Sequence, residues 1–258
     1  MRTILLCCVV ALCVLATAFP LAAQEVGDEW VEPITGMEFV WVPGGCYEMG
    51  CGEWAGDCYE NEYPVHEVCV DGFWMGKYEV TRLQWNMVMG SGGLDKLEQG
   101  NMPIVVSRYK VSNFLFLVSF LNAFRIKFRL PTEAEWEYAC RSGGLREMFS
   151  GGREIYSVAW FFRNSDYKLH DVGTRNANGL GIHDMSGNAW EWTQDWYSAQ
   201  AYTEHEVDNP VYCRESELIV VRGGSVAYGE DSARCSSRIG FSEDSLTSYA
   251  GFRLVFSN

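Results

Sequence analysis

The sequence has few histidines and no C-x-x-C cysteine pair. Its four histidines are scattered, and no two of them show an H-x-x-x-H spacing; they are His66, His170, His183 and His205. A structural zinc site built on a C-x-x-C knuckle also needs a second ligand pair. The sequence therefore argues against zinc, and histidines placed this way are more often loop or surface residues than metal ligands.

Positive charge is also scarce. The chain has 20 Lys and Arg residues against 34 Asp and Glu residues, which gives a formal net charge of −14 at pH 7. Nucleic acids and anionic membrane surfaces are bound through clusters of basic side chains that neutralise phosphate. The composition therefore makes both of them poor partners, and the simplest consequence of the acidity is solubility.

Long apolar runs are absent after the N-terminus. Residues 1–23 combine an early charge at Arg2 with an apolar run from Ile4 to Val14 and small residues at the end. This pattern predicts a secretory signal peptide, cleaved after Ala23. No other stretch approaches the roughly 20 apolar residues of a transmembrane helix. We expect an exported, soluble protein, and the lack of an N-x-S/T sequon favours a bacterial periplasmic or extracellular one.

About 235 residues remain after the predicted cleavage, enough for one large domain. No low-complexity or linker-like run divides them. We expect a short N-terminal extension, residues 24–35, and a single domain over residues 36–258.

Seven cysteines remain beyond the predicted signal peptide, and in an oxidising compartment most should form disulfides. Cys46 and Cys69 flank an acidic loop that contains Cys51 and Cys58, which suggests nested pairs 46–69 and 51–58. An odd number leaves one thiol unpaired, and Cys213 is the candidate.

The periodicity of the sequence indicates few regular elements. Strands are expected over 37–42 and as a pair over 65–74, and helices over 81–89, over 111–124 and from Thr132 onward. Thr81 is a credible N-cap, and Thr132 opens a capping box. Beyond Gly143, short strands alternate with long loops. Such loops in a compact domain are usually functional or clamped by a metal or disulfide.

The stretch HDMSGNAWEW, from His183 to Trp192, is the most informative in the chain. Two acidic side chains, Asp184 and Glu191, stand seven positions apart around a Gly-Asn turn, which a helix interior would avoid. A loop around Ca²⁺ uses such carboxylates for charge and backbone carbonyls as further oxygen ligands. The same string could also be a tight turn between two aromatic-rich strands.

Several motifs occur in an order that resembles one protein family. They are GMEFVWVPGG from Gly36, GKYEVT from Gly76, FRLPTEAEWEYA from Phe128, the Asp184–Trp192 stretch, RGGS from Arg222 and GFRLV from Gly251. Together they resemble the formylglycine-generating enzyme, or sulfatase-modifying factor, family, and LPTEAEWE is the most specific string. The resemblance implies an α+β fold, an irregular variant of the C-type-lectin fold with little regular secondary structure.

The resemblance also implies a structural Ca²⁺ and a disulfide. The implied ligands are Asp184 and Glu191 through side-chain oxygens, and Gly187 and Ala189 through backbone carbonyls. Cys140 and Cys235 match positions that pair as a disulfide in family members.

The copper chemistry of the family lacks its ligands in this sequence. Catalytic members oxidise a substrate cysteine, and two cysteines that closely follow their Gly-Gly-Ser motif bind copper, since Cu(I) prefers soft thiolates. Here Tyr228 occupies the first cysteine position, and no second cysteine occurs before Cys235. The sequence therefore argues against copper, and no catalytic residue is assigned.

Two classes of function remain. The first is a binding or accessory/maturation role, in which the family groove holds a peptide, a protein or a small molecule. Trp190 and Ser225 match groove positions, and Tyr228, Arg222 and Arg234 lie nearby in the sequence. The alternative is an oxidoreductase that acts, through a divergent site, on a protein cysteine or on a periplasmic small molecule. We favour binding.

Overall fold

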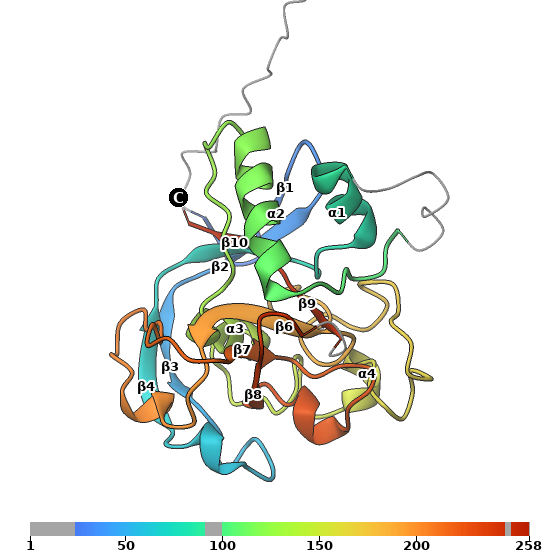
Figure 1. The fold of residues 1–258 in the computed structure, drawn as a ribbon. Coiled ribbons are helices and arrows are strands. Elements are labelled where there is room, and N and C mark those ends of the chain that lie inside the picture. The colour runs from blue at the N-terminus through green and yellow to red at the C-terminus, as the bar shows by residue number, and fades with distance from the viewer. Residues whose placement is uncertain (1–23, 91–99, 246–248, 258) are drawn as a thin grey trace, which may run out of the picture.

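Short strands and helices joined by long loops make up the fold in a computed structural model that describes residues 24–90, 100–245 and 249–257. The predicted signal peptide, residues 1–23, lies outside the described residues. Figure 1 shows α1 and α2 at one end of the molecule and the β3–β4 pair toward the other.

The first sheet is antiparallel and has the strand order β1-β2-β5-β10. Its strands are β1 (Glu29–Val31), β2 (Glu38–Val42), β5 (Phe73–Gly76) and β10 (Val255–Phe256). All four residues of β5 are buried, as expected for a central strand. The edge strand β1 lies within residues 24–35, so this stretch pairs with the sheet.

A separate two-stranded sheet joins β3 (Gly45–Met49) and β4 (His66–Val70). The sequence predicted a strand pair over 65–74, and both strands exist, but they do not pair with each other. β4 pairs with β3, and β5 pairs with β2 and β10, so the turn at Asp71-Gly72 connects two sheets. Strand pairing is decided by distant segments, which a local pattern cannot reveal.

The third sheet has the order β8-β7-β6-β9. It contains β6 (Trp190–Trp196), β7 (Ile219–Arg222), β8 (Arg238–Phe241) and β9 (Ala250–Gly251), and β9 runs parallel to β6. β6 begins inside the HDMSGNAWEW stretch. The stretch is therefore a loop followed by a strand.

The helices are α1 (Arg82–Met89), α2 (Arg108–Leu121), α3 (Glu133–Cys140) and α4 (Ile155–Val158). Over the described residues, short 3₁₀ turns lie in the loops at η1 (Glu60–Glu62), η3 (Ala201–Thr203) and η4 (Glu230–Ala233). Thr81 and Thr132 are N-caps with capping boxes, as predicted. None of the helices over the described residues is long and apolar enough to cross a membrane.

Two main core clusters hold the elements together. One packs α1 and α2 against the first and third sheets through aromatic rings such as Trp85, Phe114 and Phe252. The other surrounds α3, every residue of which is buried and which contacts β3, β4, β6 and β7. α3 thus packs against β6 and β7, the strands that contain the predicted site residues Glu191 and Arg222.

Candidate functional site

The loop before β6 has an unusual backbone. Asp184, Gly187 and Asn188 all have positive φ, at 59°, 82° and 59°. A Cβ at Gly187 would lie 2.2 Å from the carbonyl oxygen of Trp160, so only glycine fits there. The left-handed residues turn the chain sharply just before it enters the sheet.

Asp184 has one carboxylate oxygen in use and one without a partner. Its Oδ2 accepts a hydrogen bond from the Gly173 backbone N–H at 2.6 Å, whereas the buried Oδ1 has no hydrogen-bond partner among the described residues. Burial raises the pKa of Asp184 to about 6. An open, buried carboxylate oxygen is the kind of ligand that Ca²⁺ prefers.

Glu191 is also fully buried, but both of its carboxylate oxygens have hydrogen-bond partners. Its Oε2 accepts hydrogen bonds from Trp136 Nε1 at 2.8 Å and from Arg253 Nε at 2.7 Å, and its Oε1 accepts one from Arg253 Nη2 at 2.6 Å. Arg253 neutralises the charge of Glu191 in this bidentate pair. Glu191 therefore has less capacity left for a cation than Asp184 has.

Sequence reasoning missed a third buried acid, Glu79. Its Oε2 accepts a hydrogen bond from Asn188 Nδ2 at 2.8 Å, and its Oε1 accepts one from the Ala189 N–H at 3.0 Å. Burial, followed by the charges of Asp184 and Glu191, raises the pKa of Glu79 well above its ordinary value. Glu79 belongs to the GKYEVT motif, but nothing in that motif connects it with the Asp184 loop, because only the fold brings the two together.

The loop therefore fits a cation in part. Three buried carboxyl groups face one nearby guanidinium, that of Arg253, and one carboxylate oxygen is open. The oxygens of Glu79, Asp184 and Glu191 do not all lie within 4.8 Å of one another; among the described residues, a group of three ligand-type atoms that close is formed by Cys51, Cys58 and Glu62. There the two sulfurs form a disulfide and Glu62 pairs with Arg234, so these groups have partners without a metal.

Two of the predicted groove residues border a cavity of about 360 Å³. Trp190 and Tyr228 are among its lining residues, which also include Tyr59, Asn61, Ser232, Ser237, Arg238 and Ile239. Tyr228 is 38% exposed and packs edge-on against Trp190, with ring centroids 5.4 Å apart. The buried Nε1 of Trp190 has no hydrogen-bond partner among the described residues. The cavity therefore combines aromatic walls with an unused donor beside them.

Comparison with known proteins places this geometry in a family. A family model described as the sulfatase-modifying factor enzyme 1-like domain matches residues 25–258. The chain belongs to this family. Serine/threonine-protein kinase Pkn1 of Chlamydia trachomatis is 29% identical over 250 residues, which cover 89% of this chain and 40% of the kinase. Formylglycine-generating enzyme of Mus musculus is 26% identical over 282 residues, covering 86% and 75% of the two chains.

This chain spans only about two fifths of the length of the Pkn1 proteins that it matches. Among solved structures, PvdO from Pseudomonas aeruginosa superposes with a TM-score of 0.79 at 22% identity, covering 92% of this chain and all of PvdO. This likeness concerns the fold alone. It confirms the α+β, sulfatase-modifying factor fold expected from the sequence.

The most specific family motif, LPTEAEWE, builds a buried ion network. Glu133 pairs with Arg238 at 2.6 Å and lies 3.4 Å from Arg222, while Glu137 pairs with Arg222 and, at 3.0 Å, with Arg141. These residues tie α3 to β7 and β8. Within the sulfatase-modifying factor domain, the motif therefore acts as scaffold.

Three other groove candidates lie in the interior of the protein. Arg222 and Arg234 are fully buried, and their guanidinium groups pair with Glu137 and Glu62 respectively. Ser225 is buried as well, and its Oγ accepts a hydrogen bond from the Ala227 N–H at 3.4 Å. None of the three lines the Trp190–Tyr228 cavity. Ser225 was suggested by its match to a groove position of the family, and Arg222 and Arg234 by nearness in the sequence. The two arginines are inside the protein because buried charges are held in ion pairs.

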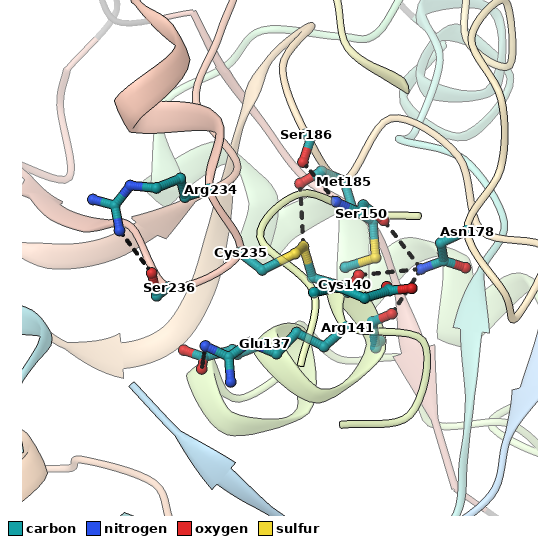
Figure 2. Close-up of a disulfide and its surroundings, with 12 residues drawn as sticks. Glu137, Cys140, Arg141, Ser150, Asn178, Met185, Ser186, Arg234, Cys235 and Ser236 are labelled. Carbon is teal, nitrogen blue, oxygen red and sulfur yellow. Dashed lines mark hydrogen bonds and ion pairs between the residues drawn. A yellow bond between two sulfur atoms is a disulfide. The ribbon is translucent and has the colours of Figure 1, made fainter. Parts of the chain in front are cut away.

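The predicted disulfides are confirmed. Cys46–Cys69, Cys51–Cys58 and Cys140–Cys235 are bonded, and Cys213 is a free, exposed thiol. Figure 2 shows Cys140–Cys235 between α3 and the segment around Ser186, where Ser186 Oγ accepts from the Ser150 N–H at 3.0 Å. This disulfide fixes the end of α3 to the segment after η4, and Cys140 Sγ also lies 3.6 Å from the backbone carbonyl oxygen of Met185 in the loop before β6.

Proposed function

We propose that the chain is an exported, calcium-stabilised domain of the sulfatase-modifying factor family that binds a ligand in the Trp190–Tyr228 cavity. The observation that carries this proposal is the cavity itself, which has aromatic walls and is lined by Trp190, whose buried indole N–H has no hydrogen-bond partner among the described residues. Pockets with apolar walls and a few polar groups are the usual form of ligand sites.

A binding or accessory role accounts for the residues better than copper chemistry does. Tyr228 stands where the motif of catalytic members has its first copper cysteine, and Cys235 is held in a disulfide with Cys140. A phenol and a disulfide sulfur cannot supply the thiolate pair that Cu(I) prefers. The ligand class that suits the cavity is a peptide side chain or small molecule with an apolar ring and a polar edge.

Calcium would be held by Asp184 through its open Oδ1 and by the backbone carbonyls of Gly187 and Ala189. Glu191 would contribute only as far as Arg253 and Trp136 leave its oxygens free. The ion would neutralise the buried charge of Asp184 and Glu79 and would fix the loop that leads into Trp190. Its role in this proposal is structural.

Export is supported by the three disulfides, since such bonds form and persist in oxidising compartments. The predicted signal peptide agrees with this. Periplasmic and extracellular destinations are equally compatible with it.

Saturation-transfer NMR with para-cresol tests the cavity. Its ring matches the aromatic walls, and its hydroxyl group can pair with Asn61 or Ser237. We expect wild type to bind it, and Tyr59→Ala and Tyr228→Ala to weaken binding about fivefold each, since each removes one aromatic contact. Tyr156→Ala, at another exposed tyrosine, is the matched control. If the cavity variants bind as wild type does, the ligand site lies elsewhere.

Mass spectrometry of a Cys-X-Pro-X-Arg peptide tests the alternative. The peptide is incubated with the protein, copper, oxygen and a thiol reductant, beside a formylglycine-generating enzyme with both copper cysteines. We expect an unmodified peptide. Conversion of its cysteine to an aldehyde would show that the chain has a divergent catalytic centre.

A further inference from the structure

The solvent face of α2 exposes large aromatic side chains. Tyr109, Phe116 and Phe120 follow one another at spacings of seven and four residues, which places them on one stripe of the helix. Phe116 is 62% exposed and Phe120 is 58% exposed. Phe124, just beyond the helix, is 57% exposed, and its ring centroid lies 5.9 Å from those of both Phe116 and Phe120. These four residues are called the α2 aromatic face below.

The exposed aromatic side chains of α2 are not part of the hydrophobic core. Val111, Phe114 and Val118 point to the opposite side of α2 and are completely buried in the core next to α1. A surface helix normally carries polar residues on its outer side. Exposed clusters of large apolar residues usually mark a site of interaction. Figure 1 shows α2 at the end of the molecule, beside α1.

The same segment has an unusual charge. Residues 108–129 contain five basic residues and no acidic residue, in a chain of net charge −14; they are Arg108, Lys110, Arg125, Lys127 and Arg129. Arg129 pairs with Glu135 at 2.6 Å, and the nearby carboxylate of Glu243 partly offsets Arg108. The other three are exposed, and no salt bridge joins them to a carboxylate in the described part of the chain.

We propose that the α2 aromatic face docks the protein onto an anionic lipid bilayer. The phenylalanine rings would enter the interface, and Lys110, Arg125 and Lys127 would meet lipid phosphates, as in other interfacial helices. The net charge predicted the opposite, because it averages over the whole surface. At physiological ionic strength, charges act over only about 8 Å, so the local cations outweigh distant carboxylates.

The positive charge of the segment favours an anionic lipid surface over a second copy of the chain as the partner of the α2 aromatic face. A two-fold symmetric dimer through this face would place the cations of one copy near the same cations of the other. The segment contains no acidic residue to compensate them. Like charges brought together at an interface oppose association.

Vesicle co-sedimentation tests the proposal. Wild type is expected to sediment with vesicles of equal parts phosphatidylcholine and phosphatidylglycerol, less with phosphatidylcholine alone, and less in high salt. The triple variant Lys110→Gln, Arg125→Gln, Lys127→Gln should bind the anionic vesicles on the order of 100-fold more weakly, since each cation near the surface contributes about fivefold. The double variant Phe116→Ser, Phe120→Ser should lose binding as well.

Matched controls keep the result specific. Arg163→Gln with Lys168→Gln removes two exposed cations from another loop, and Leu145→Ser removes an exposed apolar side chain elsewhere. Both should bind as wild type does, and all variants should unfold at the wild-type temperature. The proposal is overturned if wild type stays in solution with anionic vesicles, or if the charge variant binds equally well. A dimer that the Phe116→Ser, Phe120→Ser variant abolishes, without vesicle binding by wild type, would assign the face to a second copy.

Discussion

At the scale of single residues, the loop before β6 concentrates negative charge where water does not reach it. Glu79, Asp184 and Glu191 are buried together, and Arg253 compensates only one of them. Buried carboxylates that lack a partner either take up a proton or bind a cation. Asp184 is the residue at which these two outcomes can be told apart, because one of its oxygens is open.

The first prediction concerns Asp184→Asn in the presence of a chelator. The folded-state pKa of Asp184 is about 6, above the ordinary 3.8, so the folded protein holds this proton more tightly than the unfolded chain does. The proton therefore stabilises the fold below pH 3.8, and this contribution is lost as the pH rises through about 6. We expect the variant to match wild type at low pH and to be more stable, by up to about 3 kcal/mol, well above pH 6. Urea unfolding across this pH range measures the difference.

The second prediction is that calcium makes wild type more stable than Asp184→Asn, the reverse of the order expected in chelator. An ion that binds only the folded state raises its stability by mass action. Wild type in calcium should therefore gain thermal stability, and Asp184→Asn should gain little. Glu147→Gln, at a partly exposed acid that Ser142 contacts, is the control and should respond to calcium as wild type does. If calcium stabilises wild type and Asp184→Asn equally, Asp184 is not a ligand.

The third prediction concerns the buried ion network of α3. Glu137 pairs with Arg222 and Arg141 and accepts a hydrogen bond from the Gly50 N–H at 2.8 Å. Glu137→Ala leaves buried guanidinium charge without its partner, so we expect a loss of about 3–5 kcal/mol in the free energy of unfolding. Glu48→Ala breaks the exposed Glu48–Arg146 pair and should cost no more than about 1 kcal/mol. Equal losses in denaturant unfolding would contradict this assignment.

At the scale of elements, the sequence predicted best what is locally encoded. The starts of α1 and α3 were correct, because Thr81 and Thr132 accept bonds from N–H groups three residues later. The range expected for α2 was shifted by three residues at both ends, and its N-cap Ser107 makes no side-chain cap bond. The pairing of β4 with β3 was missed, since it depends on residues about twenty positions away.

In the site as well, the sequence predicted the residues marked by their local neighbours and missed those that only the fold brings together. Asp184 and Glu191 were recognised as special because a Gly-Asn turn and tryptophans surround them in the chain. Glu79 has no such neighbours, and its hydrogen bonds to Asn188 and Ala189 exist only in the folded protein. Of the five residues predicted for the groove, Trp190 and Tyr228 line the cavity, whereas Arg238, which also lines the cavity, lies in a segment that no sequence pattern marked.

The contrast between capped helices gives the fourth prediction. Thr132 Oγ1 accepts a hydrogen bond from the Glu135 N–H at 3.1 Å, and Glu135 Oε2 accepts one from the Thr132 N–H at 2.9 Å. Thr132→Ala removes half of this capping box and should cost about 1 kcal/mol of stability. Ser107→Ala, at the N-cap of α2, removes no cap bond and should cost less. Similar losses in the two variants would show that the burial of Thr132 and Ser107, and not a cap hydrogen bond, determines how much each contributes to stability.

At the scale of the whole molecule, the disulfides constrain very different lengths of chain. Cys140–Cys235 joins residues 95 positions apart and encloses the loop before β6 together with β6 and β7. Cys51–Cys58 spans seven positions and lies next to Tyr59 at the cavity. If the bonds act chiefly by restricting the unfolded chain, the long-range one should contribute the most stability of the three.

The last prediction quantifies that difference. The chain-entropy relation gives about 4.7 kcal/mol for a loop of the Cys140–Cys235 length and about 2.5 kcal/mol for that of Cys51–Cys58. Cys140→Ala with Cys235→Ala should therefore destabilise the protein about twice as much as Cys51→Ala with Cys58→Ala, in denaturant unfolding at constant calcium. The short-loop variant should in turn affect para-cresol binding more, because its bond holds a wall of the cavity. The opposite order of stabilities would mean that contacts in the folded state, and not the length of the closed loop, decide what each disulfide contributes.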